Sequence, residues 1–144
     1  RAVTLLPAMG ERTIILDCDV LQADGGTRTA AITGAYVALY QALTSLVHHG
    51  VLPSIPLRSG VSAISVGIVG SEVLLDLCYQ EDSMADVDFN VVMTDLDEYV
   101  EIQGAAEGEP FSKNTMETLM FMAVKGIKYL NGIQQAAIHT LTPR

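Results

Sequence analysis

The feature that most constrains the fold is a glycine-rich turn between an apolar strand-like segment and a long apolar helix. The segment 13–20 reads Thr-Ile-Ile-Leu-Asp-Cys-Asp-Val, and the helix is expected over about 29–48. The turn between them carries Gly25 and Gly26. This pattern predicts a β-strand and an α-helix joined by a tight turn.

The same turn has the residue types of a phosphate site. Backbone amides at a glycine pair can approach an anion closely, and the helix N-terminus adds a partial positive charge. Thr27 adds a hydroxyl group, and Arg28 adds a forked cation that suits phosphate oxygens. Gly26, Thr27 and Arg28 are therefore candidate phosphate-binding residues, with a simple change of chain direction as the alternative.

Three aspartates form a second candidate site. If 86–93 is a strand, Asp86 and Asp88 point to one face of the sheet, and Asp82 precedes them on a turn. Neighbouring carboxylates repel each other, which raises one pKa or recruits a cation. Oxygen ligands without His or Cys suit Mg²⁺ or Mn²⁺. A solvated acidic edge that prevents strand pairing explains the same residues equally well.

The remaining patterns predict an α/β fold in which helices cover a mixed or antiparallel sheet, in the order β-α-β-β-β-β-α. Four strands are expected after the first helix, at 61–69, 72–78, 86–93 and 99–103. Ser112 is a candidate N-cap of the last helix. The apolar stripe of that helix is assigned to the core and comprises Met116, Leu119, Met120, Ala123, Ile127 and Leu130.

Length and composition predict one globular domain over residues 1–144, with 49% hydrophobic and 17% charged residues. We expect no membrane span, because Gly34, Gln41 and Ser45 interrupt the longest apolar helix. The net charge of −9 argues against a self-sufficient nucleic-acid binder, which usually has a basic patch.

The two cysteines have neither metal-ligand nor redox-motif spacing. Cys18 and Cys78 both lie in apolar, strand-like patterns. We expect two buried free thiols in a reducing compartment, and a cytoplasmic localisation.

Four motifs follow one another along the chain, at 10–14, 22–30, 81–93 and 101–108. In this order and spacing they resemble the ribonuclease PH family, phosphate-dependent exoribonucleases that trim the 3′ ends of transfer RNA precursors. The resemblance runs nearly end to end. It implies the family's α/β fold, and it implies that residues 1–144 are the C-terminal portion of a domain without its N-terminal part.

The resemblance also implies a phosphorolytic ribonuclease, or nucleotidyltransferase. Inorganic phosphate would be the co-substrate, and nucleoside diphosphates would leave the RNA 3′ end. The family's catalytic aspartates fall at Asp82 and Asp88, and its phosphate-binding Gly-Thr-Arg falls at 26–28. Asp82 and Asp88 would hold Mg²⁺ or Mn²⁺, with Asp86 as a weaker ligand.

The family forms a hexameric ring, so the resemblance implies a homo-oligomer. A companion chain is one source of the N-terminal part, which in the family contributes RNA contacts. The alternative function is a non-catalytic structural ring subunit of an RNA-processing assembly. The intact residues 26–28 and the aspartate pair favour the enzyme, whereas the absent N-terminal part favours the scaffold.

Overall fold

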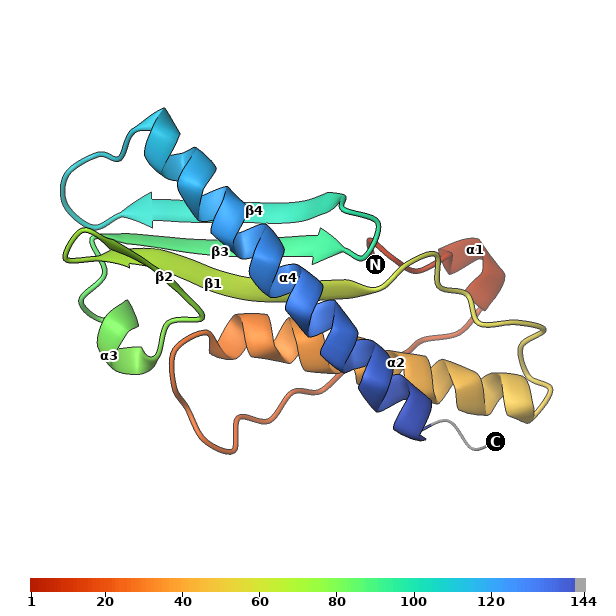
Figure 1. The fold of residues 1–144 in the computed structure, drawn as a ribbon. Coiled ribbons are helices and arrows are strands. Elements are labelled where there is room, and N and C mark those ends of the chain that lie inside the picture. Colours follow the sequence, from red (N-terminus) through yellow and green to blue (C-terminus); the bar gives the residue numbers. More distant parts are fainter. Residues whose placement is uncertain (142–144) are drawn as a thin grey trace.

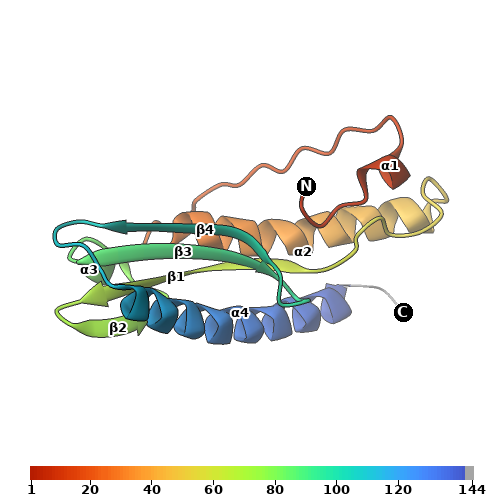
Figure 2. The ribbon, with the colours of Figure 1, turned by 90° about the horizontal axis from the view of Figure 1, so that it is seen from above.

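Four strands form one antiparallel sheet in the order β2-β1-β3-β4, with a long helix on each side (Figure 1, Figure 2). The computed structural model describes residues 1–141. The strands are β1 (Val61–Val69), β2 (Glu72–Leu75), β3 (Val87–Thr94) and β4 (Tyr99–Ala106). The helices are α1 (Leu6–Met9), α2 (Thr27–His48), α3 (Tyr79–Asp82) and α4 (Lys113–Leu141).

The main core lies between the sheet and α4. Alternation along β3 places Val87, Phe89 and Val91 in this core, as predicted, and leaves Asp88 on the opposite face. Three residues of the predicted α4 stripe are fully buried, and Met120 and Leu130 pack at the margin. Met116, in the first turn of α4, is exposed, so its assignment to the core is wrong. The three buried stripe residues are Leu119, Ala123 and Ile127.

The predicted start of α4 is confirmed. The Ser112 hydroxyl accepts a hydrogen bond from the Thr115 backbone amide at 3.1 Å, as an N-cap does. The helix therefore begins where its first free amides find a partner.

Helix α2 packs on the other face of β1. The Ala63 amide donates to the Thr33 hydroxyl at 3.0 Å, and buried Gln134 of α4 donates to the Thr33 and Val61 carbonyls. These bonds fix both helices to one strand. By length and composition alone α2 is also long and apolar enough to cross a membrane, so the sequence-based expectation that no helix reaches that threshold is wrong.

The predicted first strand is also wrong. Residues 13–20 run extended beside α2 but join no β-ladder of the described part of the chain (Figure 2). Of their apolar side chains, Ile14 packs against the small cluster around Leu43, whereas Ile15, Leu16 and Val20 face solvent, with Ile15 84% exposed. A strand needs a neighbouring edge to satisfy its amides and carbonyls, and this segment lies away from the four-stranded sheet. The observed order is therefore α-α-β-β-α-β-β-α.

The expected burial of both thiols is contradicted as well, because Cys18 and Cys78 are exposed free cysteines. Cys18 lies on the extended segment without a strand partner. Strand β2 ends at Leu75, where Asp76 adopts a positive φ of 60°, and Cys78 instead becomes the N-cap of α3. Both errors come from assuming strand pairing that the chain does not make.

Candidate phosphate and carboxylate site

The turn before α2 can be built only from glycines. Gly26 is the N-cap of α2 with a left-handed φ of 68°. A Cβ on Gly25 would lie 2.1 Å from the Leu77 carbonyl oxygen, so this position allows no side chain. The glycine pair thus lets the start of α2 approach the segment that leads into α3.

The Asp24 side chain stabilises this close approach through two hydrogen bonds. Its Oδ1 atom accepts hydrogen bonds from the Tyr79 amide at the start of α3 and from the Gly25 amide at 2.8 Å. These two bonds, the one from Tyr79 foremost, lower the pKa of the Asp24 carboxyl. The Asp24 side chain therefore links the glycine turn to the start of α3.

Arg28 reaches from the first turn of α2 to β4. Its Nη2 atom donates to both carboxylate oxygens of Glu101, each at 2.8 Å. The hydrogen bond to Glu101 raises the pKa of the guanidinium, which stays charged. Nothing in the sequence singled out Glu101, although it lies in the 101–108 motif, and only tertiary structure brings it to Arg28.

Asp88 lies on the sheet face opposite the α4 core. The Asn90 amide group donates to its Oδ2 atom at 3.2 Å. Burial raises the pKa of the Asp88 carboxyl, and repulsion from Asp82 and Glu107 raises it further. The charges of Asp82 and Asp88 thus act on each other, while their predicted joint role stays a prediction, and Glu107 is an additional acidic neighbour that sequence reasoning missed.

Asp86 has a different role. Its Oδ2 atom accepts a hydrogen bond from the Gly70 amide at 3.2 Å, so the side chain caps the β1–β2 turn. Within residues 1–141, no three His, Cys, Asp or Glu side chains converge closely enough to hold a metal ion. The expected cluster of three carboxylates is thus not formed, because the Asp86 carboxylate bonds to the amide of Gly70 in the turn between β1 and β2.

The strand register places Glu101, the ion-pair partner of Arg28, and Asp88 on the same face of the sheet. Asp88 pairs with Ala105 across β3 and β4, Asn90 with Gln103, and Val92 with Glu101. Paired residues of neighbouring strands point to the same face. The start of α2, the end of α3 and this polar face therefore surround one region, where the candidate phosphate turn and the candidate carboxylates adjoin.

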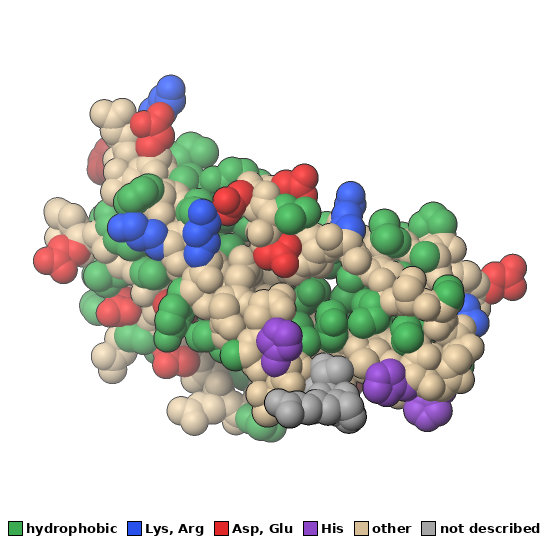
Figure 3. Space-filling view, turned by 45° about the vertical axis from the view of Figure 1, so that its right-hand side comes forward, with side chains coloured by type: hydrophobic (Ala, Val, Ile, Leu, Met, Phe, Trp, Pro, Cys, Tyr) green, Lys and Arg blue, Asp and Glu red, His purple; other side chains and the backbone are tan. Residues whose placement is uncertain are grey.

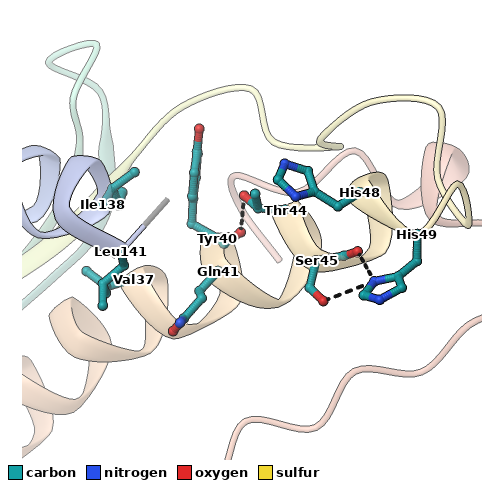
Figure 4. Close-up of a pocket in the computed structure, with 9 residues that line it drawn as sticks. All are labelled: Val37, Tyr40, Gln41, Thr44, Ser45, His48, His49, Ile138 and Leu141. Atoms are coloured by element: carbon teal, nitrogen blue, oxygen red, sulfur yellow. Dashed lines mark hydrogen bonds between the residues drawn. The ribbon is translucent and has the colours of Figure 1, made fainter. Parts of the chain in front are cut away.

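A separate pocket lies at the other end of α2. Its volume is about 290 Å³, and α2 and α4 line it with Val37, Tyr40, Gln41, Thr44, Ser45, His48, His49, Ile138 and Leu141 (Figure 4). Figure 3 shows two His side chains (purple) beside each other at the lower right and a third apart from them, near the centre, with apolar side chains (green) spread over the same face. The Thr44 hydroxyl and the His49 ring bond to carbonyls of their own helix, at Tyr40 and Ser45. The pocket thus stands apart from the polar face.

Comparison with known proteins identifies the fold and the family. Residues 60–126 match the model of the 3′ exoribonuclease family, domain 2. The chain is 54% identical over 138 residues to Ribonuclease PH of Syntrophomonas wolfei subsp. wolfei, covering 96% of this chain and 58% of that protein. It belongs to the ribonuclease PH family.

A second member of the ribonuclease PH family, from Moorella thermoacetica, is 51% identical over 144 residues and covers all of this chain. The chain spans 58% of the length of each of these two curated relatives. The crystal structure of rice (Oryza sativa) Rrp46 superposes with a TM-score of 0.64 at 18% identity, over 83% of this chain and 51% of that one. This likeness confirms the expected α/β fold.

Proposed function

We propose that this chain forms the phosphate and carboxylate site of a phosphate-dependent 3′–5′ exoribonuclease that trims transfer RNA precursors and releases nucleoside diphosphates. The observation that carries the proposal is the meeting of the 26–28 turn with the polar face that bears Asp88. Membership in the ribonuclease PH family supports the same reaction.

In the proposed reaction, inorganic phosphate docks at the N-terminus of α2. The amides of the first helical turn, the Thr27 hydroxyl and the Arg28 guanidinium would hold its oxygens. A phosphate oxygen attacks the phosphorus of the last phosphodiester bond. The bond from that phosphorus to the 3′ oxygen breaks, and a nucleoside 5′-diphosphate leaves.

The leaving 3′ oxygen needs a proton or a cation. Asp88 is proposed to donate this proton, and the burial and the repulsion from Asp82 and Glu107 that raise its pKa favour the protonated form. In the ionised form, Asp82 and Asp88 supply two hard oxygen donors, a set that Mg²⁺ or Mn²⁺ accepts when water and phosphate oxygens complete its coordination. The bound ion would supply positive charge opposite the developing negative charge.

The proposal also covers the substrate, the oligomeric assembly and the cellular localisation of the protein. RNA with a free 3′ end is the proposed substrate, and a ring of six identical chains is the proposed assembly, with cytoplasmic localisation. The part of the relatives' length outside this chain is proposed to complete the RNA-binding surface, since this chain has a net charge of −9.

The decisive experiment incubates 3′-extended transfer RNA with the protein and Mg²⁺, with and without inorganic phosphate. Nucleoside diphosphate that appears only with phosphate would support phosphorolysis. Release of monophosphates without phosphate would show hydrolysis and contradict it. A complete absence of release would contradict activity of this chain alone, and supplying the part of the relatives' length outside this chain would then restore release for the enzyme but not for the structural-subunit alternative.

A further inference from the structure

Arg28, the arginine assigned to phosphate binding, already forms an ion pair with the Glu101 carboxylate. Arg28 Nη2 bonds to both Glu101 oxygens at 2.8 Å. The two residues are 73 positions apart in sequence. The other donors of this guanidinium, Nε and Nη1, form no hydrogen bond with any residue that the structure describes. Arg28 is therefore charged and partly available, but it already has a counterion.

Glu101 and a bound phosphate would compete for the same cation, the Arg28 guanidinium. Carboxylate and phosphate oxygens both fit the guanidinium fork, and each carries negative charge. Phosphate bound at 26–28 would be repelled by a carboxylate held at Arg28. Phosphate therefore binds Arg28 most strongly when Glu101 has moved away.

The pair is weak enough for such an exchange. The Arg28 side chain is 53% exposed and the Glu101 side chain 39% exposed. Ion pairs exposed to this extent stabilise proteins only slightly, because water screens the charges. The Glu101 side chain can turn into solvent without breaking any packing of the core, which lies on the other face of the sheet.

We propose that Glu101 sets the phosphate affinity of this site by competing with inorganic phosphate for Arg28. The inference rests on the proposed function, since it takes residues 26–28 as the phosphate site. Glu101 keeps the arginine occupied when phosphate is scarce and releases it when phosphate binds. Glu101 is thus a residue that sets the affinity for phosphate and not a catalytic one.

The test measures the Kd of inorganic phosphate by calorimetry, without RNA, for the wild type and four variants. Glu101→Gln removes the competing charge and should lower the Kd about twofold to fivefold, the range set by an exposed ion pair. Glu109→Gln removes an equal charge that has no contact with Arg28 and should leave the Kd unchanged. Arg28→Gln should abolish measurable binding.

The fourth variant separates a direct effect from a general one. Combining Arg28→Gln with Glu101→Gln should give no tighter binding than Arg28→Gln alone, because the competition acts through Arg28. An unchanged or higher Kd for Glu101→Gln would overturn the inference and would make Glu101 a residue that positions Arg28. Tighter binding in the double variant would overturn it too, since charge alone would explain the gain.

The two proposals fail in different ways. If Arg28→Gln binds phosphate like the wild type, the phosphate site itself is wrong. If Arg28→Gln loses binding and Glu101→Gln gains none, only the role of Glu101 is wrong. Thermal unfolding followed by circular dichroism checks that each variant is folded.

Discussion

The Asp24 carboxylate accepts a hydrogen bond from the Tyr79 backbone amide, 55 residues further along the chain. This bond joins the glycine turn before α2 to the start of α3. Helix α3 ends at Asp82, whose charge acts on Asp88. One side chain thus sets the position of the proposed phosphate turn relative to the proposed catalytic carboxylates.

Asp24→Ala should therefore lower phosphorolytic turnover about tenfold to a hundredfold, because small displacements of reacting groups are costly. Initial rates of nucleoside diphosphate release at saturating RNA measure this effect. Asp24→Asn is the matched control, since it keeps an oxygen that can accept both amide hydrogen bonds, and it should lose less activity. Wild-type turnover in the alanine variant would contradict the proposed coupling.

The same carboxylate should make stability depend on pH at the acid end. The pKa of Asp24 in the folded protein lies below its ordinary value of 3.8. The charged form therefore stabilises the fold at pH values above 3.8, and this contribution is lost as the pH falls through the folded pKa. The free energy of unfolding of the wild type should fall toward that of Asp24→Asn in this range. A difference that is constant from pH ~6 to ~3 would argue against this linkage.

Two glycines of α4 give a matched test of core packing. A Cβ on Gly126 would lie 2.4 Å from the Ile64 Cδ1 atom, whereas a Cβ on Gly132 meets nothing within 4 Å. Gly126→Ala should destabilise the protein by about 1–3 kcal/mol through overpacking. Gly132→Ala should stabilise it by about 0.5–1 kcal/mol, because alanine is the better helix former. Urea unfolding measures both, and equal effects would refute the packing argument.

Asp88→Asn should lower turnover at least about a hundredfold, because the amide can neither donate the acid proton nor hold a cation well. Burial and the neighbouring carboxylates disfavour the Asp88 charge, so the same variant should keep or raise the melting temperature at neutral pH. Glu72→Gln, an exposed charge change on β2, should leave turnover unchanged. Retained turnover in Asp88→Asn would refute the proposed role.

Local patterns predicted much of the fold. Period-two alternation located β1, β3 and β4 to within a few residues, and helical periodicity located α2 and α4. Ser112 marked the start of α4 because a capping side chain bonds to amides only three residues away. Alternation also placed Asp88 opposite Phe89, since neighbouring strand residues point to opposite faces.

The same reasoning failed where a partner distant in sequence was needed. Residues 13–20 have the composition of a strand, but no described strand lies beside them, so they stay extended and, apart from Ile14, exposed. Asp86 shares a face with Asp88, yet its carboxylate bonds to the Gly70 amide and not to a common cation site.

The sequence by itself determined the glycine turn, the long helices, the strands of the sheet and the candidate phosphate residues, because these depend on neighbours within a few positions. Only the tertiary structure decided that Arg28 pairs with Glu101, that Asp24 holds the start of α3, and that Cys18 and Cys78 are exposed. Such pairings depend on strand register and chain crossing, which bring together residues whose distance along the chain carries no local signal.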